Sequence, residues 1–171
     1  MNNVMIDIET VSAKTNAVIA QIAAVKFEFG SDKTEKFIVN VDMLSSKKLG
    51  MHIDKDTLDW WKSKPDGVFS SMLTDAVPID DALDKLLLFI GPTSKDIVFW
   101  CQGLNFDIPI LNWSHDACNK PHPWKYWNLR DTRTIFSLCD IRMDKVERIG
   151  TYHNALDDCY TQIKYLKQAL S

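Results

Sequence analysis

The sequence is poor in the residues that mark fibrous or unfolded chains. It has only six glycines and six prolines among 171 residues, and neither forms a repeat or a linker. No apolar run approaches the roughly 20 residues of a transmembrane helix, and the first residues lack the basic leader and apolar core of a signal peptide. These absences exclude collagen, disorder and a membrane span, and we expect a cytoplasmic protein.

Paired cysteines and excess positive charge are missing as well. The four cysteines form no C-x-x-C motif, so we expect reduced thiols rather than zinc ligands or disulfides. A net charge of −3 argues against a protein that coats duplex DNA by electrostatics alone. The charge is uneven, because residues 120–148 hold seven Lys or Arg against four Asp or Glu, which is a local excess of +3.

What is present favours one packed α/β domain over residues 1–171. Apolar and β-branched runs predict strands near residues 4–9, 18–29 and 36–41, with turn residues at 30–33. Helical periodicity follows at 54–62 and 79–90, then a buried strand at 97–101 and helices from about 105, 131 and 154. Three strands in antiparallel succession, followed by alternating strand and helix, predict a mixed central sheet flanked by helices.

Two carboxylates stand at the end of the first predicted strand. Asp7 and Glu9 are two positions apart, so they project from the same face while Ile8 points into the core. Such a pair is often only a solvated strand end. Four apolar residues precede this one, which indicates a central strand whose end opens into a cleft.

A third acid follows the next buried strand. Pro109 is tolerated in the first turn of a helix, which places Asn105 to Asp107 at a helix N-terminus. Asp107 can cap that helix, or it can join Asp7 and Glu9 in a site. The sequence leaves both interpretations open.

The last predicted helix opens with a histidine and three polar residues. Asn154 and Asp157 have the spacing of a capping box, so Asp157 is interpreted as structural. His153 and Asp158 then have no structural task. A histidine in a loop is usually plain surface, and His52, His115 and His122, which have no acid at useful spacing, are interpreted in that way.

Together these segments resemble the three ordered motifs of the DEDDh (DnaQ-like) 3′-5′ exonucleases of the ribonuclease H-like superfamily. The motifs are Asp7-Ile8-Glu9-Thr10, Asn105-Phe106-Asp107 and His153-x-Ala155-x-x-Asp158. The resemblance extends from about residue 4 to 165 and is greatest to small phage and bacterial exoribonucleases, which share Trp60-Trp61, residues 123–127 and residues 130–134. Ala23 departs from the glycine that is usual in relatives, and this concerns local packing more than catalysis.

The resemblance implies a metal site and a reaction. Asp7, Glu9, Asp107 and Asp158 are expected to hold two divalent cations, Mg²⁺ or Mn²⁺, since hard cations prefer carboxylate oxygens. Two such ions activate a water and stabilise the leaving 3′ oxygen of a phosphodiester. His153 is then suited to accept the proton of the attacking water.

Substrate-binding residues follow less directly. Thr10, Asn105 and Phe106 lie beside the acids and are expected to meet the terminal nucleotide, although each also suits a core or turn position. Trp60 and Trp61 point about 100° apart on one helix, so one should be buried and the other free to stack on a base. The aromatic and basic residues between 120 and 133 resemble a single-strand platform or a packed edge strand. Asp131 is interpreted as a helix cap or an arginine partner.

The sequence therefore predicts a 3′-5′ exonuclease acting on single-stranded ends, with RNA favoured. An exodeoxyribonuclease on the same fold is the first alternative, because no motif here reports a contact to the 2′-hydroxyl. An inactive nucleic-acid-binding module is the second, although such a module has no need of four acids that repel phosphate. A homodimer is expected by family analogy only.

Overall fold

The computed structural model of the chain describes residues 1–64, 67–92 and 96–170. Its centre is a five-stranded sheet in the order β3-β2-β1-β4-β5. The strands are β1 (Asn3–Thr10), β2 (Ile19–Phe27), β3 (Thr34–Asn40), β4 (Val98–Cys101) and β5 (Leu129–Asp131). The first three pair antiparallel, whereas β4 runs parallel to β1 and β5 runs parallel to β4. The predicted mixed central sheet is confirmed.

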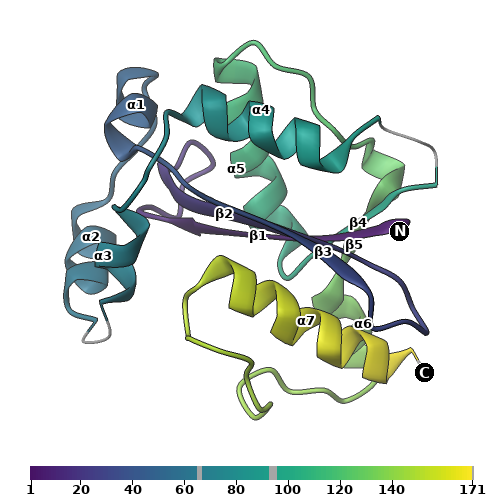
Figure 1. Cartoon of the computed structure of the whole chain (residues 1–171). Coiled ribbons are helices and arrows are strands. Elements are labelled where there is room, and N and C mark those ends of the chain that lie inside the picture. Colours follow the sequence, from purple (N-terminus) through teal and green to yellow (C-terminus); the bar gives the residue numbers. More distant parts are fainter. Residues whose placement is uncertain (65–66, 93–95, 171) are drawn as a thin grey trace.

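Helices cover both faces of this sheet. Figure 1 shows α4 (Ile79–Ile90) and α5 (Leu104–Ala117) on one face, and α6 (Thr132–Leu138) and α7 (Ala155–Ala169) on the other. Three short helices, α1 (Met43–Lys48), α2 (Lys55–Lys62) and α3 (Val68–Met72), form a group to one side. None of the helices in the described residues has the length and apolar character that a membrane span requires.

Alternation along β1 decides where its acids point. The even-numbered side chains pack into the apolar cluster that α4 and α5 share, and these are Val4, Ile6 and Ile8. Met5 packs into the second cluster, together with apolar side chains of α7. Because successive side chains of a strand face opposite sides, Asp7 and Glu9 share the face of Met5, which α7 covers.

Several elements differ from the prediction. Helices α1 and α3 and strand β5 are only three to six residues long, too short for a hydrophobic period to emerge. Helix α5 begins at Leu104, so Pro109 lies in its second turn rather than its first. Helix α7 ends at Ala169, and Leu170 after it is 49% exposed.

The interpretation of His115 as an ordinary surface residue is wrong. Its side chain lies on the inner face of α5 and is fully buried, with its ring 5.9 Å from those of His122 and Trp124. Burial, followed by the charge of His122, lowers the pKa of His115 to about 4. His122 also has an acid partner that the sequence interpretation missed, since its Nε2 lies 3.0 Å from Asp116 Oδ1. His52 is half-buried, with its Nδ1 2.8 Å from Ser12 Oγ.

Replacing His115 with Leu is expected to stabilise the fold selectively at acidic pH. The unfolded imidazole binds a proton below about pH 6.5, whereas the buried one stays neutral to about pH 4. His115 therefore costs stability as pH falls through this window, by about 2 kcal/mol at pH 5. Urea unfolding of parent and variant at pH 8 and pH 5 measures the difference, and His52→Gln controls for loss of an imidazole. An equal change at both pH values would contradict a neutral His115.

Candidate active site

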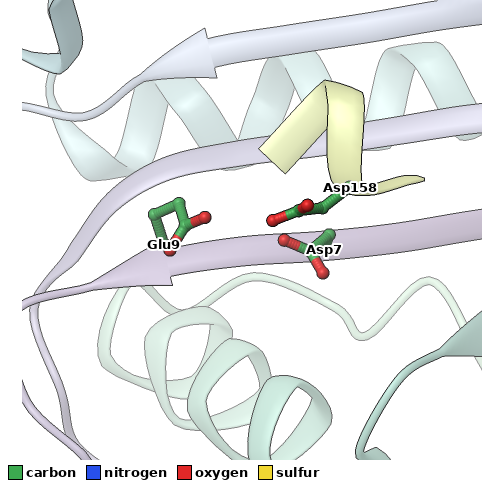
Figure 2. A group of neighbouring side chains, drawn as sticks. All are labelled: Asp7, Glu9 and Asp158. Carbon is green, nitrogen blue, oxygen red and sulfur yellow. The ribbon is translucent and has the colours of Figure 1, made fainter. Parts of the chain in front are cut away.

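Three carboxylates meet between β1 and α7. One oxygen from each of Asp7, Glu9 and Asp158 lies within 4.8 Å of the others (Figure 2). Gln162, one turn after Asp158 on α7, donates from Nε2 to Asp7 Oδ1 at 2.8 Å. This is the only group of three or more candidate metal-ligating side chains in the described part of the chain.

The start of α7 fixes the position of Asp158. Asn154 Oδ1 accepts hydrogen bonds from the backbone N–H groups of Leu156 and Asp157, as an N-cap should. The Asp157 carboxylate turns away and accepts from the N–H of Thr151 at 2.7 Å. Gln21 of β2 accepts from the N–H of Ala155 at 2.9 Å, which ties the helix start to the sheet. The structural interpretation of Asp157 is thus confirmed, and Asp158 points toward the acids of β1.

Asp107 approaches the same place from α5. Its carboxyl group is buried, and Oδ1 accepts from the N–H of Ile8 at 3.3 Å, between the two acids of β1. The N-cap position belongs to Gly103, so the interpretation of Asp107 as a cap is wrong. The backbone N–H groups of Gly103 and Leu104 instead donate to the Asp131 carboxylate. Asp131 is also the N-cap of α6, where it accepts from the backbone N–H of Arg133.

Burial raises the pKa of the acids of this site, and the charges of neighbouring acids add to the shift at Glu9 and Asp107. Burial raises the pKa of Asp7 to about 7, although the Gln162 hydrogen bond and the charge of Arg148 act against it. Burial, followed by the charges of Asp7 and Asp107, raises the pKa of Glu9 to about 9. Asp107 is shifted in the same direction, first by burial and then by Asp7. Three half-buried carboxylates, with the buried Asp107 beside them, fit hard divalent cations.

His153 lies in the loop just before α7, and hydrogen bonds to that helix anchor the loop. The N–H groups of Ile149 and Thr151 donate to side chains of α7, at 3.0 and 2.7 Å. His153 itself has a left-handed backbone, with φ 61°. Its ring packs edge-on against Trp60 and Trp61, with centroid distances of 4.9 and 5.7 Å. Burial, and then the charges of Lys64 and Arg148, lower the pKa of His153, so the imidazole is neutral and able to accept a proton at neutral pH.

The sequence model of the Rv2179c-like 3′-5′ exoribonuclease domain matches residues 2–170 of the chain. The chain belongs to this family. The resemblance that the three motifs predict is thereby confirmed. An exodeoxyribonuclease of Enterobacteria phage T4 is 28% identical over 203 residues, a match that covers 99% of this chain and 89% of the phage protein.

Three solved structures illustrate the fold that this chain shares. Cell-death related nuclease 4 (CRN-4) superposes with a TM-score of 0.63 and 17% identity over 98% of this chain, which spans 63% of that protein. The nuclease domain of 3′hExo, a DEDDh family member bound to rAMP, superposes with a TM-score of 0.63 and 12% identity. That match covers 98% of this chain and 90% of the 3′hExo chain. S. pombe Pop2p, in a form with Mg²⁺ and Mn²⁺ bound, superposes with a TM-score of 0.63 and 14% identity. That match covers 97% of this chain and 82% of the Pop2p chain. The fold is ribonuclease H-like.

In this member of the Rv2179c-like family one tryptophan of the pair is buried and the other is exposed, as predicted. Trp61 is 2% exposed, and its Nε1 donates to the carbonyl oxygen of Thr10 at 2.8 Å, which holds the end of β1. Trp60 is 41% exposed beside His153. Thr10 is buried, and its hydroxyl donates to the carbonyl of Ser12.

The remaining predicted contacts lie around α5. Asn105 is exposed at the start of the helix, whereas Phe106 is half-buried against the apolar cluster of α4 and α5. Both neighbour Asp107 in the sequence, but no contact places them against the other acids. Their binding roles, like that of Trp60, stay predictions.

The structure does not bring the aromatic residues near 126 to the acids. Trp124 is buried, but Tyr126 and Trp127 are 81% and 53% exposed just before β5. In the parallel β1-β4-β5 array, Arg130 is level with Trp100 and Trp100 with Met5. Tyr126 and Trp127 therefore lie toward the start of β1, and Asp7 and Glu9 lie toward its end. Of these aromatic residues only Trp124 is packed, and residues 126–128 form a short 3-10 helix rather than a packed edge strand, which is β5.

Two residues of the site were not predicted from the sequence. Gln162 follows Asp158 by four positions, and this spacing places both on one helical face, so the signal was present. Arg148 forms an ion pair with Asp158 from the loop before His153. Nothing in the local pattern distinguishes it from the other cations of residues 120–148.

Proposed function

We propose that this protein is a metal-dependent 3′-5′ exonuclease that removes nucleoside 5′-monophosphates from single-stranded 3′ ends, with RNA favoured. The observation that carries the proposal is the convergence of Asp7, Glu9 and Asp158, with their oxygens within 4.8 Å. Asp107 lies buried behind them, and a neutral His153 lies in the loop before α7. No structural role of the fold requires four acids at one point, because their burial costs stability.

The donor set fits two Mg²⁺ or Mn²⁺ ions. Asp7, Glu9, Asp107 and Asp158 supply only oxygen ligands, and the thiol of the nearby buried Cys159 is directed to the backbone carbonyls of Met5 and Ala23. Bound divalent ions supply positive charge for the attacking water and the leaving oxygen. One structural neighbour is a Mg²⁺- and Mn²⁺-bound form, which supports the same ions here.

The protein's own residues supply positioning and proton transfer. Gln162 holds the Asp7 carboxylate at a fixed rotation by its hydrogen bond, and Ile8 does the same for Asp107. His153 accepts a proton as water oxygen attacks phosphorus and the bond from phosphorus to the 3′ oxygen breaks. The products are a nucleoside 5′-monophosphate and a strand that ends in a new 3′-hydroxyl.

The choice of RNA rests on the family description and on the rAMP in one structural neighbour. The T4 relative is named an exodeoxyribonuclease, and this observation keeps a DNA substrate as the second candidate. A homodimer stays a proposal by analogy, which sedimentation of the same preparation would test.

Digestion of matched RNA and DNA oligonucleotides in Mg²⁺ or Mn²⁺ tests the proposal. A 5′-labelled strand should shorten as a ladder, whereas a 3′-labelled strand should release its label at once as a mononucleotide. A bulky 3′ block should protect the strand. Faster RNA digestion supports the exoribonuclease, and faster DNA digestion supports the alternative. Cleavage of a circular single strand at the linear rate would contradict any exonuclease.

A further inference from the structure

Two cations, each lying over an aromatic ring, flank His153. Lys64 Nζ is 4.0 Å from the centroid of the Trp60 ring, and Arg148 Cζ is 4.4 Å from that of the Tyr152 ring. The rings of Trp60 and Tyr152 are themselves 4.9 and 6.2 Å from the imidazole of His153. Both cations therefore lie next to the histidine, on segments about 80 residues apart in sequence.

The described residues do not fully satisfy the charge of either cation. An aromatic face attracts a cation without neutralising it, and Lys64 has no ion pair within the described part of the chain. Arg148 pairs with Asp158 through one terminal nitrogen, while its buried Nε has no hydrogen-bond partner there. A guanidinium has five N–H donors and commonly binds phosphate through two of them, so Arg148 retains capacity for an anion.

We propose that Lys64 and Arg148 form a phosphate-binding pair for the backbone of a single strand, one phosphate contact each. The inference rests on the proposed function, because a histidine that deprotonates the attacking water must lie within a few ångströms of the phosphate under attack. Cations beside His153 then lie along the path of the backbone. They offset the repulsion between the strand and the acids.

The pair also explains the surroundings of Trp60. The indole ring lies next to Lys64 and to His153, so part of its surface is used to position these two side chains. The part that stays exposed is available to a base. Trp60 is thus a positioning residue for Lys64 as well as a candidate stacking surface.

Salt-dependent binding of a single-stranded RNA oligonucleotide tests the pair. All proteins carry Asp7→Asn, an isosteric change that stops cleavage and still accepts the Gln162 hydrogen bond. Each lost phosphate contact should reduce the slope of log K against log[salt] by about 0.7. Lys64→Gln and Arg148→Gln should each do so, and the double variant should lose about twice as much. Lys62→Gln, an exposed lysine two residues before Lys64, is the matched control and should retain the slope.

The outcomes separate this inference from the proposed function. If Lys64→Gln leaves the slope unchanged, the pair is wrong even where the natural chain degrades 3′ ends. If the slope falls as expected but the natural chain cleaves neither RNA nor DNA, the nuclease proposal fails and the phosphate-binding pair stands. Arg148→Gln removes the partner of Asp158 and could unfold the site, so Arg148→Lys is measured beside it. This variant keeps the charge and should retain the slope, and a loss equal to that of the Gln variant would contradict a charge-based contact.

Discussion

Replacing Asp7 with Asn is expected to abolish both cleavage and the thermal response to metal. In the parent, Mn²⁺ at 100 times its dissociation constant should stabilise the fold by about 2.7 kcal/mol. For a domain of this size that is roughly 5–11 °C in melting temperature, and chelator should reverse it. Asp7 is one of the three acids whose oxygens converge, and its charge acts on both Glu9 and Asp107, so Asn removes a charged ligand from the set. Thermal melting with and without Mn²⁺, together with oligonucleotide digestion, measures both effects.

Without metal, the same variant should be more stable than the parent at pH 8. The pKa of Asp7 rises from 3.8 to about 7 in the folded protein, so the folded state holds a proton that the unfolded chain releases. Stability is therefore lost as pH rises from about 4 to 7, and Asn removes this loss.

Asp157→Asn is the matched control for Asp7→Asn, since that acid neighbours Asp158 but bonds to Thr151. It should respond to Mn²⁺ as the parent does. A normal rise in melting temperature for Asp7→Asn would contradict the four-carboxylate metal site.

Replacing His153 with Asn should slow cleavage by about 10²- to 10⁴-fold, the usual loss for a general base, while the response to Mn²⁺ is kept. Asn tolerates the left-handed backbone of this position, φ 61°, better than Ala does. The lowered pKa of His153 further predicts that the parent keeps its rate down to a pH below 6.5 and then loses it as the imidazole is protonated. Single-turnover rates from pH 5 to 9 measure this profile.

His52→Gln changes a histidine outside the acidic cluster, so it serves as the control and should cleave at the parental rate. Parental cleavage by His153→Asn between pH 6 and 9 would show that another group accepts the proton. A lost Mn²⁺ response would instead make His153 a support of the metal site.

The acids of β1 could be predicted from the sequence because strand alternation is a local rule. Positions 7 and 9 share a face in any register, and four apolar residues before them indicate a central strand. Asp107 was ambiguous for the opposite reason. Its role depends on Ile8, 99 positions away, and on Asp131, which binds the N–H groups at the start of α5 and leaves Asp107 without a capping task.

Contacts between segments far apart in the sequence explain why the surroundings of His115 and Arg148 could not be predicted. No local pattern marks His115 as buried, and only the fold places Trp124 and His122 against its ring. Arg148 pairs with Asp158 because the loop before α7 folds back onto that helix. By contrast, it could be predicted that one of Trp60 and Trp61 is exposed and the other buried, because neighbouring side chains on one helix point about 100° apart.

The positions of Asp7 and Asp158 also bear on biosynthesis. One lies on the first strand and the other on the last helix, so 150 intervening residues must fold before their carboxylates can meet. Closing so long a loop is slow compared with local contacts. A chain still emerging from the ribosome therefore has the two acids of β1 but lacks Asp158, His153 and Gln162. Nuclease activity would therefore begin only when α7 docks, and an unfinished chain would be inactive.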